Sequence, residues 1–383
     1  MKQDISLYIH IPFCVSKCRY CDFLSFPSCT EGEQIRYMEA LMQEIEAYRE
    51  LAQGYKVTTL FLGGGTPSIL KEGLVEQLFH KLYSVWQISE DAEITLEANP
   101  GTLTREKLAE YRTCGINRLS IGLQSSRNDE LKKLGRIHNY EQFVANYQLA
   151  RAMGFRNINV DIMAALPGQN LHSYGQTLAR ITALKPEHIS AYSLIVEEGT
   201  PLAEDETLLK ELPSEQEERR MYYYTRKALQ GEGYERYEIS NYAKAGYACR
   251  HNQVYWTGGD YLGLGLGASS YFRGQRYHNP NNMQNYCSLA QAGRITEMRE
   301  DVVSDTENSR MEEYMFLGLR MMCGVSIEGF EKRFGKPMDE VYGPVIQSYE
   351  KQGLLRRKNG WLQLTERGID VSNQIFADFL LDT

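Results

Sequence analysis

The sequence predicts an α/β fold: a partial (βα)6, TIM-like barrel followed by a C-terminal, mainly helical, winged-helix-like module. Three observations predict it. Short apolar strands alternate with helical patterns in the first half, which implies parallel pairing through crossover helices. This rhythm changes near Gly199. The chain has 383 residues, 42% of them hydrophobic, which suits one large barrel with an appendage or two to three domains. We expect a barrel over 1–200, a barrel-flanking region over 201–300 and a C-terminal domain over 301–383.

The strands and helices of the predicted barrel can be read in order. Six segments have the length and apolar character of buried parallel strands, namely 5–11, 59–62, 93–98, 118–121, 157–162 and 189–193. Five helical patterns separate them, namely 34–53, 74–83, 105–114, 140–153 and 173–184. Six such units favour a partial barrel over a small open sheet.

The second half of the chain differs in character. A polar, Tyr-rich helix is expected over 215–231, and 234–282 is rich in glycine and aromatic residues with poor helical periodicity. Beyond Asp305 the pattern predicts helices over 326–334 and 338–352, a hairpin over 354–364 that turns at Asn359-Gly360, and a last helix opened by Thr365. This order is typical of winged-helix modules.

Charge argues against nucleic acid as a partner. The chain has 42 Lys and Arg against 50 Asp and Glu, a net charge of −8. The helix that would enter a DNA groove carries Asp339, Glu340 and Glu350 against Lys351. We therefore expect the winged-helix-like module to serve packing or interaction.

The expected compartment is the cytoplasm. Mean hydropathy is −0.46, no run of about 18 apolar residues is present, and the N-terminal residues lack the core of a signal peptide. Four of the eight cysteines crowd the start of the chain, an arrangement better suited to a metal site in a reducing compartment than to disulfides.

The strongest motif is the cysteine triplet Cys14-Val-Ser-Lys-Cys18-Arg-Tyr-Cys21, directly after the first strand. Three thiolates at these spacings can face one point from a loop. Structural zinc would need a fourth ligand, for which His10 and Cys29 are the nearby candidates. An iron–sulfur cluster is the other solution, and three protein ligands would leave one iron open. Structural or redox thiols are the third alternative.

This triplet, with an aromatic residue before its last cysteine, resembles the radical S-adenosylmethionine (SAM) enzymes. The resemblance implies that Cys14, Cys18 and Cys21 hold a 4Fe–4S cluster. It also implies that SAM chelates the fourth iron through its amino and carboxylate groups.

Polar residues and glycines at the other strand ends support a binding site there, because functional groups of βα barrels gather at the carboxyl ends of the strands. The second strand ends in 63–67, Gly-Gly-Gly-Thr-Pro, and the third in 97–100, Glu-Ala-Asn-Pro. The fourth ends in Gln124, and the fifth holds Asp161 among apolar residues. Taken singly, these are also compatible with a plain turn, a cap or a solvated side chain, and Arg136 with a surface residue.

Five segments match one branch more closely: 8–14 (YIHIPFC), 63–67, 97–100, 119–125 (LSIGLQS) and 161–169 (DIMAALPGQ). Together they resemble the oxygen-independent coproporphyrinogen III oxidase superfamily, over essentially the whole chain. The resemblance implies that Tyr8, Gly64 and Glu97 contact SAM near the cluster. Further SAM-contacting positions would be Tyr20, Gly65, Thr66, Gln124, Arg136 and Asp161. Whether the chain takes one SAM or two stays open.

Two departures put the oxidase reaction in doubt. The oxidases carry a further cysteine two residues after the third ligand, where this chain has Phe23, and a segment of some tens of residues before the cluster, where only 13 residues precede Cys14. Whether the chain is an enzyme is therefore open. The alternative function is a radical SAM oxidoreductase that acts on a porphyrinogen.

A third feature indicates a particular branch. The segment 251–256 reads His-Asn-Gln-Val-Tyr-Trp, and a glycine-rich run follows over 261–268. The pattern HNxxYW resembles the HemW branch, the heme chaperones. The resemblance implies that His251 is a heme ligand, since imidazole is a common axial ligand of heme iron, and that Tyr255 and Trp256 lie flat against the porphyrin. Cys249 is a second candidate. The alternatives are a hydrogen-bonded His in a tight turn with its aromatic neighbours in the core, and a buried free thiol.

This resemblance implies heme as cargo, recipient hemoproteins, a flavodoxin-like or ferredoxin-like electron donor for the cluster, and a homodimer. The tail 374–381 is amphipathic, a pattern shared by helices that pack on a core and by helices that contact a membrane surface or a partner. We expect core packing.

Overall fold

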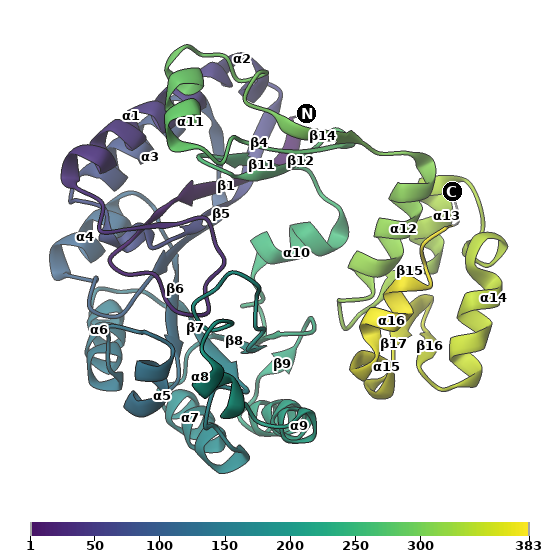
Figure 1. Cartoon of the computed structure of the whole chain (residues 1–383). Helices are drawn as coiled ribbons and strands as arrows, with labels where there is room; N and C mark the ends of the chain where they lie inside the picture. Colours follow the sequence, from purple (N-terminus) through teal and green to yellow (C-terminus); the bar gives the residue numbers. More distant parts are fainter. Residues whose placement is uncertain (1, 382–383) are drawn as a thin grey trace.

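A computed structural model describes residues 2–381 and is built on one twisted sheet (Figure 1). Its centre is six neighbouring parallel strands, each pairing with the next along the chain. They are β1 (Gln3–Ile11), β4 (Tyr55–Gly64), β5 (Gln87–Ala98), β6 (Arg118–Gln124), β7 (Asn157–Ala164) and β8 (His188–Ser193). All six predicted strands are confirmed, and their consecutive parallel order is that of a partial barrel.

Helices connect these strands and cover the outer face of the sheet. They are α1 (Glu31–Ala47), α2 (Arg49–Ala52), α3 (Leu74–Val85), α4 (Arg105–Thr113), α5 (Asn128–Lys133), α6 (Tyr140–Ala152) and α7 (Leu171–Ala183), with a 3-10 turn at Pro67–Ile69. The first helix begins three residues before its predicted start. Thr30 and Glu33 form a capping box that satisfies the first free N–H groups there.

The flanking region extends this sheet at both edges. At one edge β11 (Tyr261–Leu264) lies parallel to β1, followed by antiparallel β12 (Ser269–Phe272), β13 (Gln275–His278) and β14 (Glu300–Ser304). At the other, β10 (Asn241–Ala243) and β9 (Glu235–Arg236) follow β8. The region also contains α8 (Glu206–Lys210), α9 (Glu215–Gly231) and α11 (Met283–Gln291). These edge strands are too short for an apolar period to reveal them.

A helix that the sequence pattern did not predict lies within the glycine-rich stretch. This is α10 (Arg250–Thr257), which carries the HNxxYW motif. Its N-cap residue, Cys249, makes no side-chain cap. Instead Glu93 of β5 accepts hydrogen bonds from the backbone N–H groups of Arg250 (3.1 Å) and His251 (3.0 Å). A carboxylate distant in sequence therefore supplies the cap.

The C-terminal module has the predicted order of helix, helix, hairpin and helix. It comprises α12 (Glu307–Gly318), β15 (Val325–Ser326), α13 (Ile327–Phe334), α14 (Met338–Lys351), β16 (Leu355–Lys358), β17 (Trp361–Leu364), α15 (Glu366–Asp370) and α16 (Ser372–Ala377). The hairpin turns at Asn359 and Gly360, both with positive φ (52° and 81°), as Asn-Gly turns require. Thr365 caps α15, but the last helix is divided in two.

Three hydrophobic clusters lie in the described residues: the barrel core, the core of the C-terminal module, and a small third one that includes Leu134, Leu166 and Leu202. The barrel core extends to Met298, and that of the C-terminal module begins at Met311. Ile375 and Phe379 of the amphipathic tail are buried in the second core, as expected. The predicted domain boundaries stay predictions.

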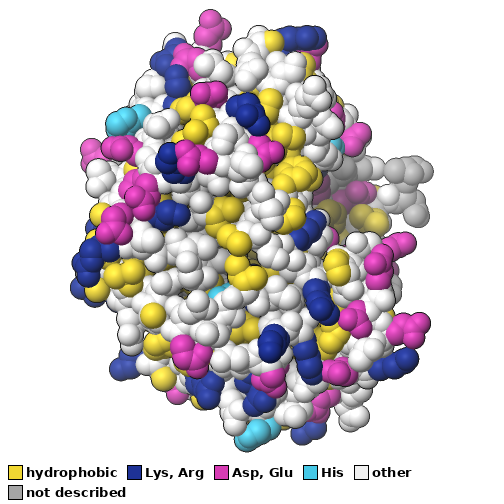
Figure 2. All heavy atoms as spheres, turned by 60° about the vertical axis from the view of Figure 1, so that its left-hand side comes forward, with side chains coloured by type: hydrophobic (Ala, Val, Ile, Leu, Met, Phe, Trp, Pro, Cys, Tyr) yellow, Lys and Arg dark blue, Asp and Glu magenta, His cyan; other side chains and the backbone are white. Residues whose placement is uncertain are grey.

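The surface shows no broad region of one charge on the face seen in Figure 2, where basic and acidic side chains alternate around small apolar areas. Over residues 2–381, no helix combines the length and the apolar character that crossing a bilayer requires.

Candidate functional site

The predicted cluster and SAM residues meet in one cavity of about 350 Å³ at the carboxyl ends of the parallel strands. All of them except Tyr8 line it. Strands β4 to β7 each contribute from their last residues, as the barrel geometry predicts. The common location is therefore observed, although the role of each residue stays a prediction.

The cysteine loop forms one wall of this cavity. Cys14 ends β2 (Phe13–Cys14), which pairs with β3 (Phe26–Pro27), and Cys18 and Cys21 follow in the loop between them. All three are free, half-buried thiols. In the described part of the chain, no three His, Cys, Asp or Glu side chains are placed to hold a single metal ion.

Glycines are required at the end of β4 because the backbone there lies very close to the backbone of the cysteine loop. Gly65 N–H donates to the carbonyl of Ile11 (2.9 Å) and Thr66 N–H to that of Phe13 (2.7 Å). A Cβ on Gly65 would lie 2.6 Å from the Phe13 carbonyl oxygen, which real contacts do not allow. The run thus fixes the loop that carries Cys14, a structural role beyond the ligand approach that its pattern suggested.

Arg136 joins the cysteine loop to the strand ends. Its guanidinium donates to the Asn99 side-chain oxygen (2.6 Å), the Gly122 carbonyl (2.5 Å) and Cys18 Sγ (3.4 Å). Asn99 in turn donates to Thr66 Oγ1 (2.7 Å). Arg136 is therefore a half-buried wall residue rather than a solvated one.

Two carboxyl groups on the cavity wall lack a cationic partner. Glu97 accepts from the Gly64 N–H (3.1 Å), and burial followed by the nearby Asp161 raises the pKa of Glu97 to about 8. Asp161 accepts from Asn159 (2.8 Å) and Ser120 (3.1 Å), and burial raises its pKa too. Neither forms an ion pair with a described Lys or Arg. A ligand with an ammonium group would supply the missing charge.

Of the three remaining predicted residues, two line this cavity and one lies outside it. Gln124 ends β6 with φ of 73° and lines the cavity. Tyr20 lines it too, and burial raises the pKa of its phenol. Tyr8 stands outside this cavity, with its OH 3.0 Å from His10 Nδ1, while His10 Nε2 donates to the Leu24 carbonyl of the cysteine loop (2.8 Å).

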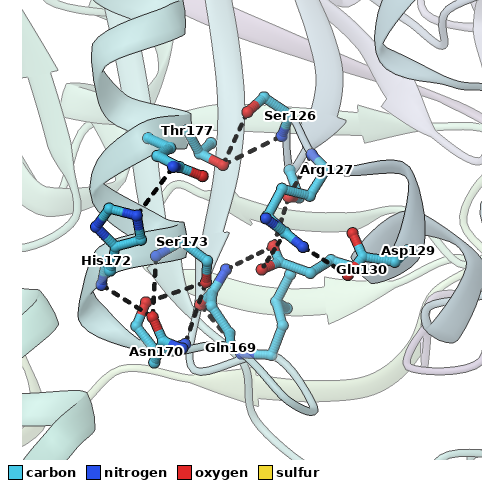
Figure 3. A network of polar contacts seen from close by, with 12 residues as sticks. Ser126, Arg127, Asp129, Glu130, Gln169, Asn170, His172, Ser173 and Thr177 are labelled. Atoms are coloured by element: carbon cyan, nitrogen blue, oxygen red, sulfur yellow. Dashed lines mark hydrogen bonds and ion pairs between the residues drawn. The ribbon is translucent and has the colours of Figure 1, made fainter.

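Some residues of the matched motifs have a supporting role that their sequence does not reveal. Figure 3 shows Glu130 and Gln169 within a polar network around the start of α7. Glu130 accepts from Ser125 (2.5 Å) and Gln169 (3.0 Å), which ties the loop after β6 to the loop after β7. Sequence reasoning also missed Asn99, Ser120, Met163 and Tyr192 as lining residues, although each lies near a predicted strand end.

A second cavity of about 650 Å³ is lined by residues of α10, of the sheet edge and of α12. Figure 1 shows α10 between the sheet and the C-terminal module. Its wall is mainly aromatic and glycine backbone, and α12 contributes from the module side. The lining includes Tyr8, His10, Tyr255, Trp256, Gly258, Gly259, Tyr261, Gly267, Tyr271, Arg276, Glu313, Phe316 and Leu317. Tyr255 and Trp256 of the HNxxYW motif thus face an open space.

His251 lies behind that wall. Its side chain is buried, its Nδ1 is 2.8 Å from Thr59 Oγ1, and its Nε2 is 2.8 Å from Tyr255 OH. The ring stacks on Phe61 with centroids 5.2 Å apart. Heme ligation by His251 stays a prediction, and it would require the bond to Tyr255 to break. Cys249 is buried, and its thiol donates to Glu93 (3.4 Å).

The parallel sheet with three cysteines after its first strand defines a protein of the radical SAM class. The model of the radical SAM superfamily matches residues 8–181, and that of the HemN C-terminal domain matches 305–371. Heme chaperones HemW from Lactococcus lactis and Bacillus subtilis are each 36% identical, over 100% and 98% of this chain and 99% of theirs. That of Escherichia coli is 34% identical over 99% of this chain and 98% of its own. The chain belongs to the HemW family of heme chaperones.

A solved structure shares the fold. The coproporphyrinogen III oxidase HemN of Escherichia coli, described as a radical SAM enzyme, superposes with a TM-score of 0.88 at 24% identity and covers 99% of this chain and 90% of its own. This likeness extends through the C-terminal module. Membership of the radical SAM superfamily implies a 4Fe–4S cluster and SAM as cofactors. Three free thiols and two unpaired carboxyls around one cavity fit that pair of groups.

Proposed function

We propose that this chain binds heme in the cavity beside α10 and hands it to recipient hemoproteins. The observation that carries the proposal is the cavity itself: about 650 Å³, aromatic-walled, and formed by the HNxxYW helix together with glycine backbone. Its volume is in the range of cofactor sites, and flat aromatic and glycine surfaces suit a porphyrin. The relatives are named heme chaperones, which supports the same proposal.

Polar groups in the wall suit the two propionates of heme. The indole Nε1 of Trp256 is buried and has no hydrogen-bond partner among the described residues. Arg276 also lines the cavity, although it already pairs with Glu313 of α12 (2.7 Å). A propionate beside Arg276 would find a cation there.

At the other cavity, Cys14, Cys18 and Cys21 would hold the cluster. Glu97 and the backbone of Gly64 and Gly65 would hold SAM. Tyr20, Thr66, Gln124, Arg136 and Asp161 would complete its site. When bound, the cluster supplies one-electron chemistry, and the protein's task is to orient SAM and exclude water. An electron donor of the flavodoxin or ferredoxin type and a homodimer belong to this proposal as well.

The experiment is an anaerobic heme titration of the cluster-reconstituted protein, followed at the Soret band. Saturable binding is expected, and His251→Ala is expected to weaken it at least tenfold without changing the cluster absorbance. Heme uptake no greater than that of an unrelated acidic protein would contradict the proposal. Rapid SAM- and reductant-dependent conversion of coproporphyrinogen would favour the porphyrinogen oxidoreductase instead.

A further inference from the structure

A smaller cavity of about 260 Å³ adjoins the second cavity. The two share five lining residues, which are Trp256, Gly258, Tyr271, Glu313 and Leu317. The smaller one, here the adjoining cavity, is otherwise lined mainly by the C-terminal module, from α12, α13 and the segment 321–326 between them. A ligand of the second cavity therefore has this additional space beside it.

Two arginines of the adjoining cavity have no ion-pair partner. Arg310 of α12 and Arg333 of α13 both line it, and neither side chain forms an ion pair or a hydrogen bond within residues 2–381. They differ in this from Arg276, the other arginine in the walls of the two cavities, whose guanidinium donates twice to the Glu313 carboxylate (2.9 and 2.7 Å). Two positive charges are therefore left for a ligand.

The guanidinium of Arg333 lies at the boundary between the cavities. Its two terminal nitrogens are 3.6 and 3.7 Å from the position that a Cβ on Gly258 would occupy, and Gly258 lines both cavities. Arg310 is close to it, because the guanidinium carbons of Arg310 and Arg333 lie 5.9 and 5.7 Å from the centroid of the same ring, that of Phe334. Two like charges thus lie near each other, an arrangement that an anion between them would stabilise.

The carboxylates whose charge acts on these arginines are engaged elsewhere. Glu307 forms an ion pair with Lys336 (2.9 Å). Asp260 accepts from the backbone N–H of Arg273 (3.3 Å). Neither contacts Arg310 or Arg333 as an ion pair, so an anionic ligand would not have to displace a carboxylate of the protein.

We propose that Arg333 and Arg310 bind the two propionate carboxylates of heme, whose ring lies in the second cavity. This inference rests on the proposed function. Heme carries two carboxylates on one edge of a flat apolar ring, and two unpaired guanidinium groups beside an aromatic-walled cavity match that pattern. The glycine at position 258 leaves the space in front of Arg333 free of a side chain. Arg276 is the weaker candidate, because Glu313 already neutralises its charge.

The test compares ferric heme with its dimethyl ester, in which neither carboxylate is charged. Both are titrated into the full-length, cluster-reconstituted protein in the same solvent and followed at the Soret band. The wild type should bind the free acid at least tenfold more tightly than the ester. Arg310→Gln and Arg333→Gln should each lower this ratio at least threefold, and the double variant should bring it close to one, with the affinity for the ester unchanged. Both side chains are exposed, so their replacement should leave the fold intact.

Lys332→Gln is the matched control. It removes one positive charge from the same helix, at an exposed position that lines neither cavity, and should keep the wild-type ratio. If the double variant does not fold, the two single variants decide the question, since each should lower the ratio by itself.

The outcomes separate the inference from the proposed function. A preference for the free acid that persists in the double variant would place the carboxylates elsewhere, such as at Arg276. An equal loss of affinity for acid and ester would mean that the arginines shape the cavity without binding carboxylates. Either result, or a wild type that binds acid and ester equally, overturns the inference and leaves heme binding intact. Absence of saturable heme binding by the wild type overturns both.

Discussion

At the scale of single residues, the cavity beside the cysteine loop is distinguished by two carboxyl groups without an ion-pair partner. Glu97 and Asp161 are both carboxyls in the cavity wall; burial raises the pKa of each, and neither forms an ion pair with a described Lys or Arg. Such an arrangement costs stability in the protein without its ligand. It is explained if an ammonium group normally occupies the space beside them.

Glu97→Gln tests this explanation. A bound ammonium would favour the ionised form of Glu97, whose pKa burial and Asp161 raise to about 8. A charge-assisted hydrogen bond contributes about 1.5–3 kcal/mol, so the loss should weaken SAM binding about 10- to 100-fold. The measurement is calorimetric titration of SAM into the cluster-reconstituted protein. Glu90→Gln, an exposed residue of the same strand, is the control. Equal SAM affinity in the Glu97 and Glu90 variants would show that Glu97 does not contact the ligand.

At the scale of elements, sequence patterns predicted what depends on local information. The six parallel strands are long, apolar and buried. The polar residues at their ends could be predicted to form a site because a barrel brings these ends together. The capping of α10 could not be predicted from local sequence, because the capping residue, Glu93, comes from β5. The second cavity could not be predicted from sequence either, since it forms only where α10 and α12 come together.

One helix illustrates how a buried charge organises the edge of the sheet. Glu44 of α1 accepts from the Gly265 N–H (2.8 Å), Tyr286 OH (2.7 Å) and Asn279 side chain (2.7 Å). These contacts hold the loop after β11, whose Gly267 lines the second cavity. Burial nevertheless raises the pKa of Glu44 to about 7, because the three donors do not fully replace water.

Glu44 should therefore make stability depend on pH. The unfolded pKa of a glutamate is about 4.3, so the folded state binds this proton more tightly. The free energy of unfolding should then fall as pH rises from about 4.3 to about 7, by up to about 4 kcal/mol, and level off above. Chemical denaturation from pH 5 to 8 should show this slope in the wild type and in Glu39→Gln, an exposed variant of the same helix. Glu44→Gln should lose it. Parallel profiles for all three proteins would refute the assignment.

At the scale of the whole molecule, the two cavities are built from different parts of the chain. The cluster cavity is closed by strand ends and the cysteine loop, all within the first 192 residues. The second cavity needs the C-terminal module, because Glu313, Phe316 and Leu317 of α12 form one side of it. Tyr8 and His10 line the second cavity, and His10 also donates to the Leu24 carbonyl of the cysteine loop. The module thus completes the second cavity, whereas the barrel alone forms the first.

Phe316→Ala should separate the two sites experimentally. Phe316 is half-buried on α12 and lines only the second cavity, so its loss should leave folding and the cluster absorbance unchanged. Burying a phenylalanine side chain against a ligand contributes about 1.5–3 kcal/mol. The variant loses part of this contribution, so its heme affinity should fall about 5- to 50-fold. Parallel titrations with heme and with SAM measure both affinities, and Leu380→Ala, an exposed position of the same module, is the control. A loss of SAM binding equal to the loss of heme binding would mean that the module acts on the whole barrel. An unchanged heme affinity would place heme elsewhere than in this cavity.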